Sequence, residues 1–407
     1  MRSGRDPRTG SGEWLVWWRK YSGAPAVWVP CDRGRPADRR ERIRGTPGQQ
    51  VTATHAVEEF GEMSDCDRVR IGVIGAGWFA SRRHLPDMQR DERLELVALC
   101  RRDEAALAKM GDHFGVALRF TDYRRMIDEC ALDAVLVATP HNVHHAPAKY
   151  ALERGLHVLM EKPLTIAVEE GAELVALADA KQRVLTVALN PPYWKHCHAI
   201  RDRVREIGEV ETIEFLDTSN AEGVFGRVPL PDSLPGVVPP TLFRGDVEAN
   251  GGGNLIDGGS HLLSEVVWCT GQMPVEVTCV MDDCPADMRS VATLRMPNGA
   301  LCALSVLADS GYPGKRCHHA YYGTAGSVYA TGFPFELVTR PADGETTLQR
   351  ESEMPEVPTP VGDFASAVLT GAPSLSPGRE ALKVVSLLEA AYESARTGRP
   401  VEPKNVS

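Results

Sequence analysis

Val69-Arg70-Ile71-Gly72-Val73-Ile74-Gly75-Ala76-Gly77-Trp78-Phe79-Ala80 is the stretch that decides the fold. Its first six residues form a short apolar run typical of a buried strand, and a G-x-G-x-x-A pattern follows from Gly75. Gly75 allows a tight turn, and Gly77 lets the backbone approach a pyrophosphate at the N-terminus of the next helix. A lone G-x-G is weak evidence. Here a strand precedes the loop and a helical stretch follows it, so we predict a dinucleotide site that includes Trp78 and Phe79.

The pattern after this loop alternates between apolar runs and amphipathic stretches. It predicts, in chain order, strand 94–100, helix 103–113, a short strand near Leu118, helix 122–130, strand 133–138 and helix 143–154. Strands that alternate with helices of this length indicate a parallel sheet wrapped by helices. The expected fold class is therefore α/β, with a doubly wound parallel sheet.

The next strand ends at Met160-Glu161-Lys162-Pro163. Proline cannot continue a sheet ladder, so Glu161 and Lys162 are expected at the carboxyl edge of the strand. Ligands bind at that edge of an open parallel sheet, and a lysine there can contact a cofactor and a substrate together. The alternative is a solvated ion pair in a strand-to-helix turn. Thr165 is the expected N-cap of a following helix that ends at Lys181.

Two further positions bear on the cofactor. An acidic residue about twenty positions past the glycine loop binds the 2′-hydroxyl of NAD, whereas arginine suits the 2′-phosphate of NADP. Arg101 and Arg102 stand there, so we predict NADP, with NAD as the alternative. The two arginines could instead form a solvated corner that does not contact a cofactor. Thr139 and Pro140 are expected to turn against the cofactor, and His144 to line the wall of its site.

A second glycine-rich stretch, Gly251 to His261 (GGGNLIDGGSH), starts a predicted helix. Asp257 and His261 are four residues apart, a spacing that places both side chains on one helix face. So many glycines are costly in a purely structural segment, which favours a functional site over a surface ion pair. We expect Gly258 and Gly259 to let a ligand approach the backbone, and a Gly- and Pro-rich loop at 221–240 to cover the site.

These motifs together resemble the Gfo/Idh/MocA family of NAD(P)-dependent oxidoreductases over residues 69–401. Ala138-Thr139-Pro140 with Asn142 and His144, the Gly155 to Pro163 segment, and the G-G-G-x-L-x-D-x-G-x-H pattern carry the resemblance. It implies a dinucleotide-binding fold followed by an α/β domain with a large, mostly antiparallel sheet that often mediates homodimers or homotetramers. It also implies substrate contacts at Asn190, Tyr193, Arg244, Asp257 and His261, although Pro192 occupies the position where relatives have arginine.

Composition divides the chain in a compatible way. Residues 1–50 carry 11 basic and 5 acidic side chains, which leaves a formal charge of −16 on residues 51–407. We expect the first 67 residues to be a basic, disordered extension; alternatively, translation begins at Met63. A dinucleotide-binding domain is expected at 68–189 and a substrate-binding and oligomerisation domain at 190–402. The acidic body argues against nucleic acid as a partner. The scattered cysteines and the lack of a long apolar run predict reduced thiols, no metal site, no membrane span and a cytoplasmic location.

The expected chemistry is hydride transfer between the nicotinamide and a hydroxyl or keto carbon of a sugar, cyclitol or related polyol. Lys162 and His261 are predicted to share the acid/base role, and Asp257 to orient the imidazole and hold a second hydroxyl. Three functions remain open: a sugar or cyclitol dehydrogenase, a biosynthetic keto-sugar reductase, and an NADP-binding regulator on the same fold. The presence of Lys162, Asp257 and His261 together argues against the regulator.

Overall fold

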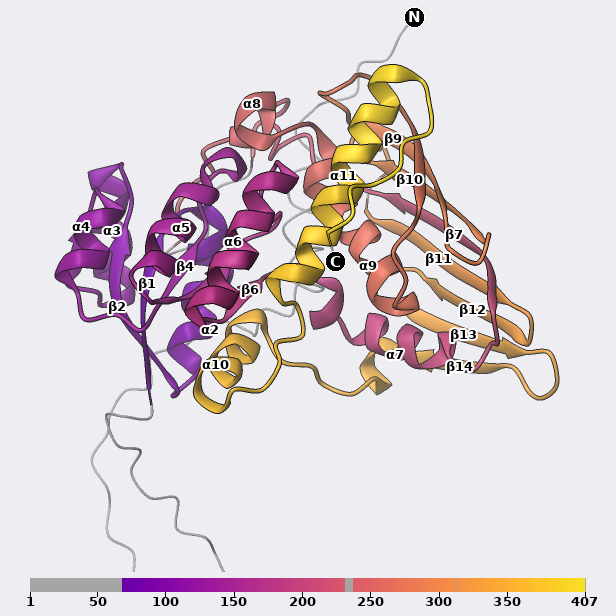
Figure 1. Ribbon diagram of the computed structural model, residues 1–407, viewed down its shortest axis with the longest axis horizontal. Coiled ribbons are helices and arrows are strands. Elements are labelled where there is room, and N and C mark those ends of the chain that lie inside the picture. Colours follow the sequence, from indigo (N-terminus) through magenta and orange to yellow (C-terminus); the bar gives the residue numbers. More distant parts are fainter. Residues whose placement is uncertain (1–67, 231–236, 313, 407) are drawn as a thin grey trace, which may run out of the picture. The chain divides into compact units, whose positions relative to one another are not determined.

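The computed structural model describes residues 68–230, 237–312 and 314–406 (Figure 1). These residues fold around two β-sheets. The first sheet is parallel throughout. Its strands, in spatial order, are β3 (Leu118–Phe120), β2 (Leu94–Cys100), β1 (Val69–Ile74), β4 (Ala134–Val137), β5 (His157–Met160) and β6 (Leu185–Val187). The chain order reverses between β1 and β4, where an open α/β sheet forms its ligand crevice.

Helices cover both faces of this sheet because its strands are apolar on both sides. The helices around it are α2 (Leu85–Arg90), α3 (Glu104–Phe114), α4 (Tyr123–Glu129), α5 (His145–Glu153), α6 (Val168–Lys181) and α10 (Pro360–Thr370). One apolar layer contains Met110 of α3 and Phe364 of α10, and the other contains Leu152 of α5 and Leu174 of α6. The predicted doubly wound parallel sheet is confirmed.

The second sheet is antiparallel except for the pair β7 and β10. Its strands, in spatial order, are β14 (Thr347–Arg350), β13 (Glu336–Pro341), β12 (Gly326–Thr331), β11 (Arg316–Gly323), β7 (Val210–Thr218), β10 (Leu301–Leu307), β9 (Arg289–Arg295) and β8 (Glu276–Met281). Helices α7 (Lys195–Val204), α9 (Ser260–Thr270) and α11 (Gly378–Thr397) lie on one face, as Figure 1 shows. The large, mostly antiparallel second sheet expected from the family resemblance is therefore present.

The structure has two short helical elements that were not predicted, at 141–143 and 247–250, and two helices start differently from the prediction. The expected helix at 143–154 is a 3₁₀ turn (His141–Val143) followed by α5. Thr165 is not an N-cap: its hydroxyl donates to the carbonyl of Ala167, and the first amide of α6 donates instead to the Glu389 carboxylate of α11 (3.2 Å). The Asp257 segment is a π-helical turn (Leu255–Gly259) that runs into α9. A short helix, α8 (Val247–Asn250), precedes it.

Several expectations concern residues that the structure covers only in part. The predicted extension at 1–67 lies outside the described residues, as do 231–236 of the predicted cover loop. Pro240, the last residue of that loop, and the following Thr241 and Leu242 border the cavity described below. Cysteines in the described ranges are all unpaired. No helix in those ranges is both long and apolar enough to span a bilayer.

Candidate active site

The glycine loop follows β1 and closes one end of a cavity. Gly75 has a φ of +85°, and a Cβ atom there would lie 2.6 Å from the Ala138 carbonyl group, so only glycine fits. The amides of Gly75 and Ala76 both donate to the Cys100 carbonyl, which joins the loop to the end of β2. Gly77 differs, because a Cβ atom there would meet nothing closer than 3.5 Å. The protein atoms around Gly77 are therefore at ordinary contact distance and do not crowd its backbone.

The cavity has a volume of about 890 Å³ and lies at the carboxyl ends of the parallel strands. Ten of the eleven predicted cofactor residues line it: Gly75, Gly77, Trp78, Phe79, Arg101, Arg102, Thr139, Pro140, Glu161 and Lys162. Its far wall is formed by Leu242, Phe243 and Arg244 from the segment before α8. A cavity of this size, with aromatic and basic walls, fits a dinucleotide.

His144 is the exception, because it lies beneath the cavity rather than in its wall. Its side chain is fully buried, with Nδ1 2.8 Å from the Pro163 carbonyl and Nε2 2.9 Å from the Thr139 carbonyl. Burial lowers the pKa of His144, so the ring is neutral and donates to one of these carbonyls at a time. The residue joins the ends of β4 and β5, and the prediction that it contacts the cofactor is wrong.

Arg101 and Arg102 lie at opposite depths in the predicted adenosine corner. Arg101 Nη1 donates to the Ala76 carbonyl (2.9 Å), so this guanidinium holds the glycine loop, and burial lowers its pKa. Arg102 is exposed and lines the cavity. The corner is therefore basic, with one arginine bound to the loop and the other presented to the cavity.

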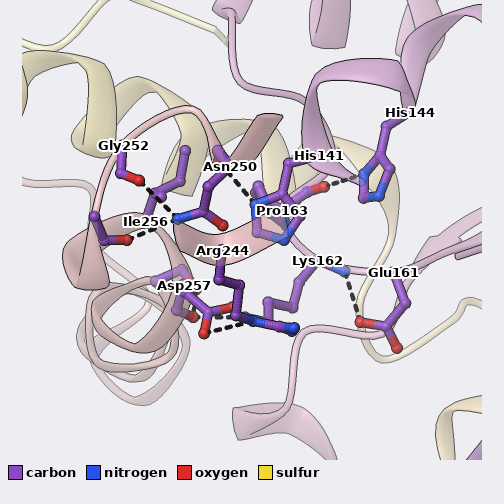
Figure 2. A network of polar contacts seen from close by, with 12 residues as sticks. His141, His144, Glu161, Lys162, Pro163, Arg244, Asn250, Gly252, Ile256 and Asp257 are labelled. Carbon is purple, nitrogen blue, oxygen red and sulfur yellow. Dashed lines mark hydrogen bonds and ion pairs between the residues drawn. The ribbon is translucent and has the colours of Figure 1, made fainter. Parts of the chain in front are cut away.

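Lys162 stands where the predicted cofactor and substrate sites meet. Its side chain is 11% exposed, and Nζ donates to the Asp257 side chain (Oδ1, 2.5 Å) and to the Asp257 carbonyl (2.6 Å). Arg244 Nε donates to the other carboxylate oxygen (Oδ2, 2.9 Å). Figure 2 shows the Lys162 and Arg244 side chains together at this carboxylate. Burial alone would raise the pKa of Asp257, but Arg244 and Lys162 hold it well below its usual range.

Glu161 does not face Asp257 but turns back toward the glycine-loop helix. Its Oε1 is in hydrogen-bond contact with Nε2 of the buried His84, and its Oε2 accepts from the Lys162 amide (3.2 Å). The solvated ion pair considered for Glu161 and Lys162 is therefore not formed. Each residue instead joins β5 to a different part of the molecule.

His261 lies in the first turn of α9, four residues after Asp257, but Asp257 does not orient its ring. Both Asp257 oxygens bind Lys162 and Arg244, while His261 Nδ1 is buried and has no hydrogen-bond partner among the described residues. The wide π turn alters the angle between positions four apart, so the α-helical spacing argument fails here. Burial, and then the nearby Lys162, lower the pKa of His261 well below its ordinary range.

The predicted substrate residues divide into two groups. Arg244 lines the cavity, and Asp257 and His261 lie beside Lys162. Tyr193 is buried, and its hydroxyl donates to the Asp363 carboxylate of α10 (2.9 Å), so its prediction as a substrate contact is wrong. Asn190 precedes the 3₁₀ turn Pro191–Tyr193 and does not line the cavity.

Sequence reasoning also missed His141, which lines the cavity beside Pro140. Its Nδ1 lies 2.9 Å from the Asn250 carbonyl, and the Asn250 amide in turn donates to the carbonyls of Gly252 and Gly253 (Figure 2). Burial lowers the pKa of His141 well below its ordinary range, so the ring is neutral. Its place directly after Thr139-Pro140 was the available signal.

The glycines of the second stretch serve packing. A Cβ atom on Gly258 would lie 2.8 Å from Asn254 Oδ1, and one on Gly259 2.6 Å from Leu255 Cδ1. Protein atoms of the preceding turn thus fill the space that we expected a ligand to use. The expectation that a ligand approaches this backbone is wrong.

Two buried groups have metal-ligand chemistry, His196-Cys197-Glu265 and Asp217-Cys317-His319. Their carboxylates already have partners: Glu265 is bound by His319 and the Tyr321 hydroxyl, and Asp217 by Lys315 Nζ (2.8 Å). A lysine beside a carboxylate disfavours a cation there. That the chain has no metal site stays a prediction.

Comparisons with known proteins agree with this geometry. Residues 69–189 match the oxidoreductase family model with a NAD-binding Rossmann fold (GFO_IDH_MocA), and 206–329 match the GFO/IDH/MocA C-terminal domain. The chain is 26% identical to D-xylose 1-dehydrogenase (NADP(+)) 2 of Haloferax volcanii over 341 residues, covering 81% of this chain and 98% of that protein.

An uncharacterized oxidoreductase of Rhizobium meliloti (ORF334) is 31% identical over 248 residues, with 59% of this chain and 68% of that protein covered. The aldose-aldose oxidoreductase of Caulobacter crescentus shares the fold, with a TM-score of 0.70, 22% identity, and 82% and 99% of the two chains covered. The chain therefore belongs to the GFO/IDH/MocA family of NAD(P)-dependent oxidoreductases.

Proposed function

We propose that this protein transfers hydride between a nicotinamide cofactor and a hydroxyl or keto carbon of a sugar, cyclitol or related polyol. The observation that carries the proposal is the position of Lys162. Its ammonium group lies at the wall of the dinucleotide cavity and is held by Asp257 from the second glycine-rich segment. Substrate oxygen bound there would lie beside the cofactor.

The residues around Lys162 suit both directions of the reaction. The nicotinamide supplies the hydride acceptor or donor. The Lys162 ammonium can donate a hydrogen bond to the substrate oxygen in both directions, and His261 can return to a ketone oxygen, on reduction, the proton that it takes in the reverse reaction. The neutral His261 ring can take the hydroxyl proton when an alcohol is oxidised. Asp257 remains ionised and fixes the lysine between these partners.

Sugar-type substrates and NADP are supported by separate observations. The relative from Haloferax volcanii is named as an NADP-dependent D-xylose dehydrogenase, and the Caulobacter crescentus structure as an aldose-aldose oxidoreductase. Arg101 and Arg102 give the adenosine corner positive charge, which favours the 2′-phosphate of NADP over the hydroxyl of NAD.

Assembly as a homodimer or homotetramer is also part of the proposal. One face of the second sheet exposes apolar side chains, among them Val280 (69% exposed), Val291 (51%) and Leu301 (50%). Exposed apolar side chains on one face of a sheet are typical of a subunit interface. Light scattering on the purified protein should give a multiple of the chain mass, and a monomer would contradict this part.

The test is nicotinamide absorbance with a panel of sugars, inositols, amino-sugars and keto-sugars. Wild-type protein should turn over at least one class, and Lys162→Ala should lower turnover by about a hundredfold or more, the scale of general acid–base catalysis. His261→Ala should have a similar effect. Lys149→Ala is the matched control, because Lys149 is a surface lysine of α5 that pairs with Glu173. Tight NADP binding without turnover of any substrate would favour the regulator instead.

A further inference from the structure

The helical segment that carries Asp257 starts without a capping side chain of its own. The first four amides of a helix have no acceptor inside the helix and need partners from elsewhere. The amides that lead into this segment belong to Gly253, Asn254, Leu255 and Ile256, and the Asn254 side chain, although it stands at the N-cap, makes no capping hydrogen bond. Two glycines, Gly251 and Gly252, directly precede these four residues, so no Ser, Thr or Asp stands at the start of the segment.

Two residues from distant elements accept the hydrogen bonds of all four amides. The Gly253 and Ile256 amides donate to the Tyr392 hydroxyl oxygen (3.0 and 3.3 Å). The Asn254 amide donates to the Asp287 carbonyl (2.6 Å), and the Leu255 amide to Asp287 Oδ2 (2.8 Å). The Tyr392 hydroxyl itself donates to Asp287 Oδ1 (2.8 Å). Asp287 precedes β9 and Tyr392 belongs to α11.

The fit around this external cap is tight. A Cβ atom on Gly252 would lie 2.4 Å from the Tyr392 hydroxyl, and one on Gly253 2.1 Å from the Asp287 carbonyl oxygen. Asp287 is fully buried, and its carboxylate faces the N-terminal end of a helical segment, where negative charge is favourable. Tyr392 and Asp287 can therefore pack this closely only because positions 252 and 253 are glycines.

We propose that Asp287 and Tyr392 are positioning residues, which hold the Asp257 carboxylate between Lys162 and Arg244. The inference rests on the proposed function. Asp257 directly follows the last of the four capped amides, so a shift of the cap would displace its carboxylate. A misplacement of about 1 Å can cost as much as a hundredfold in rate even when the altered residue is remote from the chemistry.

The experiment uses Tyr392→Phe, which keeps the ring and removes the oxygen. Turnover should fall about tenfold or more, while the dissociation constant for NADP changes by less than about twofold, because the cofactor cavity is intact. Hydrogen exchange at residues 253–256 should accelerate by about tenfold or more, while α6 keeps its protection. Asp287→Asn, which retains one side-chain oxygen, should show a smaller loss of turnover and serves if Tyr392→Phe does not fold.

Tyr150→Phe is the matched control. The Tyr150 hydroxyl also donates to an aspartate, Asp128 (2.7 Å), but on the exposed side of α5, and its removal should leave turnover unchanged. Unchanged turnover and exchange in folded Tyr392→Phe would overturn the proposal, as would equal losses in Tyr150→Phe. If wild-type protein turns over no substrate, the proposed function fails, and the exchange rates at 253–256 still decide whether the cap exists.

Discussion

Glycines occur for opposite reasons at the two ends of the site. In the first loop, the nearest atoms to a Cβ on Gly77 would be 3.5 and 3.6 Å away, an ordinary contact distance, so no protein atom crowds its backbone. In the second segment, a Cβ on Gly253 would collide with Asp287 at 2.1 Å, so the corresponding space holds protein. Similar glycine runs thus mark an approach by a ligand in one place and by the chain itself in the other.

This difference shows what a glycine pattern can and cannot indicate. Glycine reports that something comes close to the backbone, because it lacks a Cβ. Whether the group that comes close is a ligand or another part of the chain depends on the three-dimensional surroundings. In this protein the open loop belongs to the cofactor cavity, and the filled segment gives Asp257 its fixed position.

The largest effect is expected when the filled segment is overpacked. Gly253→Ala should lower the free energy of unfolding by about 3 kcal/mol or more, because the added methyl meets backbone atoms that cannot rotate away. Chemical denaturation measures this change. Gly311→Ala is the control, since a Cβ there would meet nothing within 4 Å. Equal stability of the two variants would show that the segment is not filled as described.

The second prediction concerns the buried carboxylate that fills this segment. Burial raises the pKa of Asp287 to about 6, despite opposing hydrogen bonds from Tyr392 and Leu255, and Asp282 adds to the rise. A carboxyl whose pKa is higher in the folded state contributes stability below its unfolded pKa of about 4, and loses it as pH rises through about 6.

Wild-type protein should therefore lose roughly 2 to 3 kcal/mol relative to Asp287→Asn as the pH rises from about 4 to above 6. Denaturation curves of both proteins across this range measure the difference. A stability difference that is independent of pH would contradict the role given to burial.

The open loop gives the third prediction. Gly77→Ala should leave the melting temperature nearly unchanged, because the new methyl makes only ordinary contacts. Dinucleotide affinity should fall about tenfold, since that methyl occupies the space needed for the pyrophosphate. Isothermal titration with NADP and a thermal melt separate these two effects. A stability loss as large as that of Gly253→Ala would remove the contrast between the segments.

The smallest effect is expected at the corner that chooses the dinucleotide. Arg102→Ala should weaken NADP binding about fivefold and leave NAD binding nearly unchanged, because an exposed ion contact contributes about 1 kcal/mol. The ratio of the two dissociation constants is the readout. Arg125→Ala, which removes an exposed arginine of α4 paired with Glu129, is the control. An equal loss for NAD and NADP would contradict the NADP preference.

Much of the first sheet could be predicted from the sequence, because local patterns determine it. The strand-loop-helix at Val69 to Ala80 and the proline after Lys162 are short-range signals with a direct structural cause. They located the glycine loop and ten residues that line one cavity. The sequence also predicted that Lys162 and His261 share one site, whereas the ion pair between Lys162 and Asp257 was not predicted.

The errors come from contacts between residues far apart in the chain. Tyr193 binds Asp363, 170 positions away, and the α6 start is capped by Glu389, 221 positions away. Neither partner has a local sequence signature. Asp257 and His261 have α-helical spacing, but a π turn and two competing cations decide where the carboxylate points. The sequence carries no sign of the Asp287 and Tyr392 cap, because Asn254 is a residue type favoured at a helix N-cap and only the structure shows that its side chain makes no capping hydrogen bond.

The most direct test of the account is a double-mutant cycle on turnover for Lys162 and Asp257. Because the two side chains form one ion pair at the reacting position, Lys162→Ala and Asp257→Ala should each be severe, and their combination should be little worse than the more severe single variant. Losses that multiply in the double variant would show that the two residues act independently and would contradict a shared site.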